Sequence, residues 1–262
     1  MAVVAGYDID ELVRDFRVNG FVVFEAFIAH EKIDHILQCW APVRDADIEN
    51  QGEFPGRGRV RYNVRVPFRA PFVDEEIFEH PALVAFLEAE LGEEYVFSHF
   101  DSNVPLKGSG YQRWHRDGRA SLFPGIRTPA HDIGVKFPLC DTNEENGSFE
   151  VLPASQYVHA DDLPQDLNSV FGDGPEVNGP FHPVRLNLKK GSLWVQDGRA
   201  IHRGTPNRSE QPRDELCMGI SRPWTVSNWQ IENTEPHFSK TLWDSLSDHA
   251  RQVLRWQRVK DD

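Results

Sequence analysis

The sequence predicts a mainly β protein with flanking helices, arranged as a sandwich or jelly roll. After Gly92 the chain consists of short strand-like runs separated by Gly, Pro, Asn and Asp, which is typical of such folds. A length of 262 residues with 39% hydrophobic side chains supplies enough apolar material for one core. The predicted strand-like runs are 94–105, 111–117, 131–140, 148–152, 182–188, 192–196, 200–203 and 215–222.

The first 92 residues predict helices as well as strands. Apolar side chains recur at helical spacing in three segments, and Gly92 ends the last of them. Residues 59–66 alternate arginine or asparagine with Val or Tyr, the period of a strand with one polar face. The predicted elements are helix 10–17, strand 21–24, helix 30–40, loop 41–58, strand 59–66 and helix 83–91.

No repeat, low-complexity tract or linker divides the chain, so we expect one domain over 1–262. Within it, 1–92 forms a supporting segment, 93–224 the β core and 240–258 a closing helix. Residues 160–181 are rich in Pro, Gly, Asp and Asn, which predicts a long surface insertion.

Composition excludes several classes of partner. The formal charge of −13 disfavours nucleic acid and anionic membranes. The longest apolar run, 21–29, is broken by Glu25 and is too short for a membrane span, and the N-terminus shows no export signal. The three cysteines are far apart, so neither a disulfide framework nor a thiolate zinc site is expected, and a cytoplasmic location fits.

Three His-x-Asp pairs are candidate metal ligands. Residues i and i+2 of a strand project from the same face, so such a pair can hold one ion. A third ligand completes a two-His, one-carboxylate site that leaves positions open on Fe(II). The pairs are His99 with Asp101, His115 with Asp117, and His159 with Asp161.

Context favours the second pair. His159 opens the predicted insertion, where a rigid site is not expected. His99 lies in a strand-like run and is a competitor, although a locally hydrogen-bonded histidine explains it better. The pair at His115 ends a run and precedes Gly118, a natural place for an open site.

The candidates for the third ligand are His182, His202 and His237. His202 lies in a run followed by a Pro-Asn turn and by a further strand that starts near Arg213. If these two strands form a hairpin, Arg213 lies beside His202 across the ladder. An arginine there suits the far carboxylate of a dicarboxylate co-substrate, because it binds a carboxylate with two hydrogen bonds.

Taken together, these motifs resemble the phytanoyl-CoA dioxygenase family of Fe(II)- and 2-oxoglutarate-dependent oxygenases, which have a double-stranded β-helix (a cupin-like jelly roll). The resemblance is carried by Gln112-x-Trp114-His115-x-Asp117, by the run 146–155, by His202-Arg203-Gly204 with Pro206-Asn207, and by Arg213. The segment 19–23 also resembles the N-terminal passage from helix to strand in the family. It departs at Ser155-Gln156, where relatives commonly have Gly-Ser-His.

The resemblance implies that His115, Asp117 and His202 bind iron and that Arg213 holds the side carboxylate of 2-oxoglutarate. It implies oxidation of a small molecule by O2 with release of succinate and CO2. Halogenating relatives have Gly or Ala in place of the carboxylate, so Asp117 favours hydroxylation over halogenation, with desaturation and ring formation as related outcomes.

Other residues have two interpretations each. Lys136, in an apolar strand, either reaches the co-substrate or points to solvent, and Gln112 and Trp194 either line the pocket or pack in the core. Among the C-terminal tryptophans, Trp229 is the best candidate for a ligand contact.

Two rival functions use the same residues. A cupin-like metalloenzyme would use the three ligands without 2-oxoglutarate, and its metal would activate water. A non-enzymatic jelly-roll binding module would make the ligand set a coincidence. Arg213 distinguishes the first rival, because a hydrolase does not need it. The sequence predicts neither the substrate nor the oligomeric state.

One further cluster concerns the substrate. Residues 57–69 hold five arginines and no acid, and Arg59, Arg61 and Arg65 share one face of the predicted strand. One interpretation is a solvated strand face. The other is the rim of a pocket that selects a carboxylate or phosphate, which predicts an anionic substrate.

Overall fold

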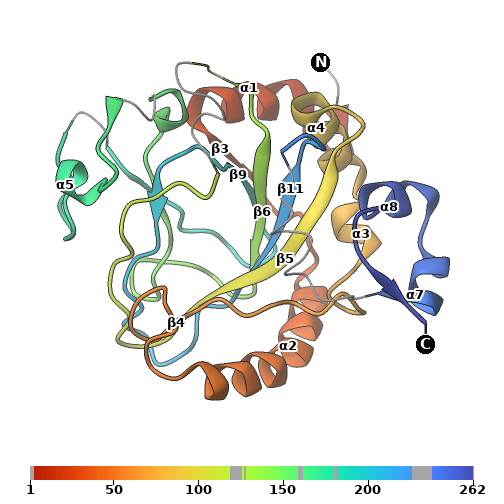
Figure 1. The fold of residues 1–262 in the computed structure, drawn as a ribbon, viewed down its shortest axis with the longest axis horizontal. Helices are drawn as coiled ribbons and strands as arrows, with labels where there is room; N and C mark the ends of the chain where they lie inside the picture. Colours follow the sequence, from red (N-terminus) through yellow and green to blue (C-terminus); the bar gives the residue numbers. More distant parts are fainter. Residues whose placement is uncertain are drawn as a thin grey trace.

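The computed structural model describes residues 3–118, 126, 128–158, 162–179, 182–225 and 238–261. Its centre consists of two antiparallel sheets (Figure 1). The larger has the strand order β3-β9-β6-β11-β5-β4 and the smaller the order β10-β7-β8, in agreement with the predicted jelly roll. Two short pairs, β1 with β2 and β12 with β13, lie outside these sheets. The strands are β1 Val3–Val4, β2 Tyr7–Asp8, β3 Phe21–Phe24, β4 Arg61–Tyr62, β5 Val96–Pro105, β6 Asp132–Pro138, β7 Glu150–Val151, β8 Val184–Arg185, β9 Leu193–Asp197, β10 His202–Arg203, β11 Glu215–Ser221, β12 Phe238–Ser239 and β13 Val259–Lys260.

The two faces of the larger sheet differ in chemistry because side chains alternate along each strand. On the outer face, residues such as Val135 and Leu216 join the main apolar core, which is completed by Phe16, Ile36 and Phe86 from three helices. The inner face is largely polar. The helices are α1 Ile9–Asn19, α2 His30–Gln51, α3 Glu75–Phe78, α4 Pro81–Leu91, η1 Ser155–Tyr157, α5 Asn168–Phe171, α7 Lys240–Ser245 and α8 Asp248–Val253.

The first helix and strand are close to the prediction. The Asp8 side chain caps α1 by accepting a hydrogen bond from the Glu11 N–H, and Gly20 ends the helix at φ 82°, a conformation that favours glycine. Strand β3 follows at once and pairs with β9 at the edge of the larger sheet.

Two N-terminal predictions are wrong. Residues 41–51 belong to α2 and not to a loop, because Val43 and Ile48 pack against the core while Pro42 removes only one helical hydrogen bond. The predicted strand 59–66 is reduced to Arg61–Tyr62, which pairs with the end of β5.

Three later predictions also need correction. The segment 111–117 forms only an isolated bridge, between His115 and His202. The insertion contains α5, whose Phe171 is buried against Trp114. The closing helix is two short helices, because the Ser247 hydroxyl caps α8 and starts a new helix there.

No helix among the described residues is long and apolar enough to cross a membrane. All three cysteines are free, as expected from their spacing.

A buried ion pair ties α2 to the residue before β11. The Asp214 carboxylate accepts hydrogen bonds from the Trp40 indole N–H (2.9 Å) and from Arg44. We expect Asp214→Ala to lower the free energy of unfolding by about 3 to 5 kcal/mol, because it removes the buried carboxylate that pairs with Nη1 of Arg44 and accepts from the Trp40 indole. Urea unfolding checks this. Asp45→Ala is the control, since Asp45 is the exposed partner of the same arginine and should contribute less than about 1 kcal/mol. Equal losses in the two variants would contradict the prediction.

Candidate metal and co-substrate site

The structure brings together three of the residues singled out in the sequence. A ligand atom of each of His115, Asp117 and His202 lies within 4.8 Å of those of the other two. Two backbone hydrogen bonds join His115 to His202 (His115 N to His202 O, 3.0 Å; His202 N to His115 O, 2.9 Å). The bridge therefore places both imidazoles side by side at the end of β10.

Both imidazoles direct Nε2 toward the carboxylate. Nε2 of His115 is 3.6 Å from Asp117 Oδ1, and Nε2 of His202 is 3.3 Å from Asp117 Oδ2. The opposite nitrogen of each ring has its own neighbour: Nδ1 of His115 is 2.8 Å from the Arg113 carbonyl, and Nδ1 of His202 is 3.2 Å from the Ala200 carbonyl. Such contacts orient metal-binding histidines, so the arrangement fits a divalent metal with open positions.

Electrostatics favour the protonation states that a metal needs. Burial and the neighbouring His202 lower the pKa of His115 to about 4, which keeps this imidazole neutral near pH 7. Burial alone would raise the pKa of Asp117, but His202 and Lys136 hold it well below its usual value. A neutral imidazole and an ionised carboxylate are the forms that bind a cation.

The rival histidines do not join this cluster. The group of His115, Asp117 and His202 is the one that the described residues offer as a metal site, and His99 and Asp101 are not in it. His182 is exposed. His159, Asp161, His237 and Trp229 lie outside the described residues.

Arg213 faces the same interior, but not through a hairpin. β10 belongs to the smaller sheet and β11 to the larger one, so the predicted pairing is wrong. The two residues instead flank one ring: the Arg213 guanidinium lies 4.7 Å from the centroid of Phe149, and the rings of Phe149 and His202 are 6.1 Å apart. The turn between the strands crosses from one sheet to the other.

The Arg213 side chain has unused hydrogen-bonding capacity. It is 0% exposed, and none of its three guanidinium nitrogens has a hydrogen-bond partner among the described residues. Glu215 is the nearest acid, 3.5 Å from Nη1. A buried cation without hydrogen bonds is costly, so this position suits a bound carboxylate.

Arg61 lies next to Arg213, a placement that the sequence did not indicate. Its Nη2 donates to the carbonyls of Thr205 (2.6 Å) and Gly110 (2.9 Å), whereas its buried Nη1 has no partner among the described residues. Burial and the neighbouring Arg213 lower the pKa of Arg61 to about 9. The only available signal was its period-2 position in 59–66, which did not distinguish it from the exposed Arg59 and Arg65.

Gln112 lies beside Arg61, against the backbone of Gly204. Its Oε1 accepts a hydrogen bond from the Gly204 N–H (2.9 Å), and a Cβ atom at Gly204 would collide with both Gln112 and Arg61. Gly204 thus allows these two side chains to approach the backbone behind His202.

Lys136 points into the interior and not to solvent. Its Nζ lies 3.3 Å from Asp117 Oδ2 and donates to Gln196 Oε1 (2.6 Å). It also lies over the ring of the fully buried Trp194, 4.7 Å from the centroid. Gln196, which sequence reasoning missed, reaches Nδ1 of His202 at 2.7 Å and so links Lys136 to a second metal-ligand candidate. Its only signal was its alternation with Trp194 in the run 192–196.

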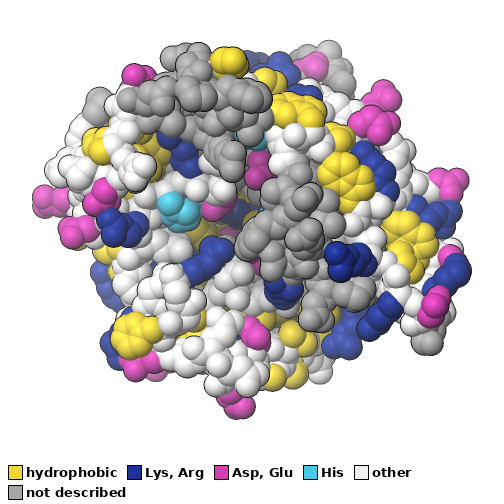
Figure 2. Space-filling model, in the orientation of Figure 1, with side chains coloured by type: hydrophobic (Ala, Val, Ile, Leu, Met, Phe, Trp, Pro, Cys, Tyr) yellow, Lys and Arg dark blue, Asp and Glu magenta, His cyan; other side chains and the backbone are white. Residues whose placement is uncertain are grey.

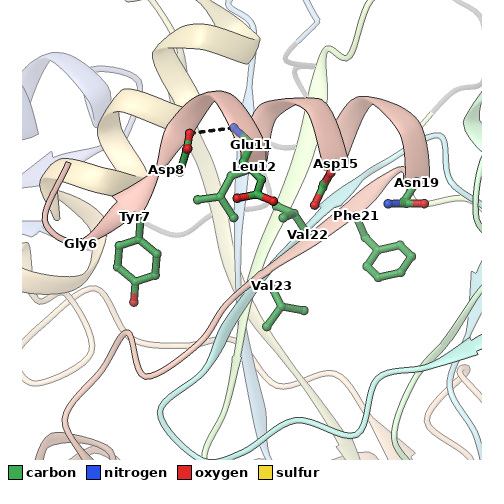
Figure 3. Close-up of a pocket in the computed structure, with 10 residues that line it drawn as sticks. All are labelled: Gly6, Tyr7, Asp8, Glu11, Leu12, Asp15, Asn19, Phe21, Val22 and Val23. Atoms are coloured by element: carbon green, nitrogen blue, oxygen red, sulfur yellow. Dashed lines mark hydrogen bonds between the residues drawn. The ribbon is translucent and has the colours of Figure 1, made fainter. Parts of the chain in front are cut away.

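A separate surface groove of about 390 Å³ lies between α1 and β3 (Figure 3). Asp8, Glu11 and Asp15 line it with apolar residues of β3. None of the candidate metal or co-substrate residues lines it.

Comparison with known proteins gives a family match. The sequence profile of the phytanoyl-CoA dioxygenase family matches residues 16–214. The curated protein "Dioxygenase af480" of Aspergillus fumigatus is 23% identical over 269 residues, which cover 95% of this chain and 81% of that protein.

Solved structures share the fold. EvdMO1 is 23% identical with a TM-score of 0.62, over 82% of this chain and 50% of that one, so this chain spans half the length of EvdMO1. SnoK, a non-haem α-ketoglutarate-dependent carbocyclase from nogalamycin biosynthesis, is 16% identical with a TM-score of 0.60, over 87% of this chain and 91% of that one. These similarities confirm the predicted fold class.

Proposed function

Because this chain belongs to the phytanoyl-CoA dioxygenase family of Fe(II)- and 2-oxoglutarate-dependent oxygenases, we propose that it hydroxylates an aliphatic C–H bond of a small molecule, with release of succinate and CO2. The observation that carries the co-substrate assignment is the buried Arg213, whose three nitrogens lack hydrogen-bond partners among the described residues. A cupin-like hydrolase has no use for such a group. A binding module without chemistry leaves the convergence of His115, Asp117 and His202 unexplained.

Each residue of the site has a proposed task. His115, Asp117 and His202 would hold Fe(II), which together with 2-oxoglutarate and O2 supplies the oxidising power for C–H cleavage. Arg213 would bind the distal carboxylate of 2-oxoglutarate through two hydrogen bonds. The presence of Asp117, where a halogenase would need a vacant position, supports hydroxylation.

The neighbouring residues would position these groups. Lys136 fixes the carboxylate of Asp117, and Gln196 connects Lys136 to His202. We propose that Lys136 and Gln112 also border the co-substrate. We also propose a single catalytic domain over 1–262, whose site draws on residues from Arg61 to Arg213.

An anaerobic titration tests the proposed function. Adding Fe(II) and then 2-oxoglutarate to the metal-free protein should produce the weak visible charge-transfer band of the iron–2-oxoglutarate chelate. A metal-dependent hydrolase would bind the metal without the band, and a binding module would show neither response. Either of these results would refute the proposal.

Arg61 provides a matched pair of variants. We expect Arg61→Ala to raise the apparent KM for 2-oxoglutarate about tenfold or more, because its free Nη1 and its charge lie beside Arg213. Arg65→Ala should leave KM unchanged, since Arg65 is exposed. Succinate formation at varied 2-oxoglutarate measures both. An equal effect of the two substitutions would remove Arg61 from the co-substrate site.

The expectation of an anionic substrate stays a prediction. Of the five arginines in 57–69, four are exposed, and Arg61 is buried beside Arg213. A contact between this segment and the substrate would therefore involve the exposed arginines at the rim, while Arg61 lies next to the co-substrate anchor.

A further inference from the structure

The segment that carries two of the proposed metal ligands is not part of a sheet ladder. Residues 111–118 form no strand, and the two backbone hydrogen bonds of an isolated bridge hold His115. Three residues on, the Gly118 N–H donates to the Gly198 carbonyl (2.7 Å). Asp117 lies between these two attachment points, so the position of its carboxylate depends on how the chain between them is held.

The ligands of this segment are open to solvent on one side. The side chains of His115 and Asp117 are 32% and 42% exposed. Figure 2 shows acidic side chains (magenta) in the hollow near the centre of one face of the molecule. Packing on the solvent side cannot fix such ligands, so the geometry of the site depends on contacts behind them.

Arg116, the residue between the two ligands, makes contacts of this kind. In an extended chain its side chain points away from those of its neighbours. Its Nε donates to the Arg199 carbonyl (2.7 Å), and its Nη2 donates to the carbonyls of Val158 (2.8 Å) and Ser155 (3.2 Å). The side chain is partly buried, and hydrogen bonds from a charged donor are stronger than neutral ones. We call this set of three hydrogen bonds the Arg116 clamp.

The carbonyls of the Arg116 clamp belong to parts of the chain that are themselves held next to the third ligand. The Ser155 hydroxyl accepts a hydrogen bond from the Ile201 N–H (2.7 Å), and Ile201 precedes His202. The Arg199 side chain pairs with Asp197 of β9, with 2.9 Å between Nε and Oδ1. The Arg116 clamp therefore connects the segment of the first two ligands to the residues that flank the third.

The geometry of a guanidinium suits this clamp. Its Nε and Nη2 donate in fixed directions from one planar group, whereas a lysine offers a single ammonium. The charge by itself would not help the site, because a positive charge beside a metal site repels the metal cation. The useful property of Arg116 is therefore the set of directed hydrogen bonds and not the charge.

We propose that Arg116 is a positioning residue, whose clamp on the 155, 158 and 199 carbonyls fixes the Asp117 carboxylate where it binds the metal. The proposal rests on the proposed function, since it takes His115, Asp117 and His202 as the metal ligands. Arg116 acts through Asp117 and touches neither metal nor co-substrate.

The first test measures metal affinity without turnover, with Co(II) as the probe. We expect Arg116→Ala to weaken Co(II) binding to the metal-free protein about ten- to a hundredfold, the usual effect of losing a group that orients a metal ligand. Competition with a chelator of known affinity measures the change. Loss of the positive charge alone would strengthen binding, so the direction of the change separates the two effects.

Two further variants separate positioning from stability. Arg116→Lys keeps the charge and the aliphatic stem but has one donor atom, so it should also weaken Co(II) binding, and it carries the test if the alanine variant does not fold. Arg255→Ala is the matched control, and it should leave Co(II) affinity unchanged. Arg255 lies outside the ligand cluster. Its guanidinium also donates to three backbone carbonyls, those of Gln252 (2.6 Å), Glu94 (2.8 Å) and Tyr95 (3.3 Å).

A double-mutant cycle tests whether Arg116 acts through Asp117. In an Asp117→Ala background, Arg116→Ala should change Co(II) affinity by less than about threefold, because the group that it positions is already gone. At saturating Co(II), the visible d–d absorption of Arg116→Ala should shift from that of the parent toward that of Asp117→Ala. A residue that only stabilises the fold would leave this spectrum unchanged.

Three outcomes overturn the inference and leave the proposed function intact. The first is unchanged or tighter Co(II) binding in a folded Arg116 variant. The second is an equal loss of affinity in Arg255→Ala, and the third is a full additional loss from Arg116→Ala in the Asp117→Ala background. Failure of the parent protein to bind Co(II), or full retention of binding in Asp117→Ala, refutes the proposed metal site instead.

Discussion

His202→Ala is expected to abolish iron binding and 2-oxoglutarate-dependent succinate formation, and His115→Ala should do the same. Each substitution removes one of two imidazoles that converge with Asp117, so the remaining ligands can no longer form a facial site. We expect iron content after anaerobic reconstitution to fall at least tenfold, with activity at background. Metal analysis and succinate release measure the two effects separately.

Two other histidines serve as controls. His182→Ala should retain both iron and activity, because His182 is exposed. His99→Ala should retain iron, since its ring lies across Gly219 and not in the ligand cluster. Loss of iron from His99→Ala together with its retention in His115→Ala would show that the first His-x-Asp pair is the metal site.

Arg213→Ala is expected to raise the apparent KM for 2-oxoglutarate by roughly one to three orders of magnitude. Truncating one partner of a desolvated charge pair typically costs about 2 to 5 kcal/mol, and Arg213 is fully buried. Affinity for iron should change little, because the guanidinium does not belong to the ligand cluster.

The control for this substitution is Arg208→Ala, at an exposed position in the segment between His202 and Arg213. It should leave KM unchanged. An unchanged KM in Arg213→Ala itself would move the carboxylate anchor, with Arg61 as the next residue to test, since the side chain of Arg222 is already bound to the carbonyls of Ala130 and Glu90.

The strands of the β core were predictable because the two signals used, alternation of apolar side chains and bordering turn residues, are both local in the sequence. In β6, Ile133, Val135 and Phe137 alternate with Gly134 and Lys136, and turn residues border the run. The extension of α2 past Pro42 was not predictable, because it depends on packing of Val43 and Ile48 against distant residues. Long-range packing overrides a local helix breaker there.

For the site, the ligand types and their spacing were visible, but the path of the chain between them was not. A Pro-Asn turn after His202 is compatible with a hairpin or with a crossing to the other sheet, and only the pairing of β10 with β7 decides between them. In the same way, period-2 alternation gave Arg59, Arg61 and Arg65 equal status. Of the three, only Arg61 is buried, and it is the one that pairs with β5, opposite Pro105.

The antiparallel pairing of β5 with β11 has an evolutionary consequence. The Arg213 anchor precedes one end of β11, and His99 lies across the strand's other half. Because the two groups of side chains occupy different rows, substitutions near His99 can be made and selected while the Arg213 anchor is retained. Such modularity favours directed evolution in which 61 and 213 are held fixed and the other half of β11 and β5 is varied.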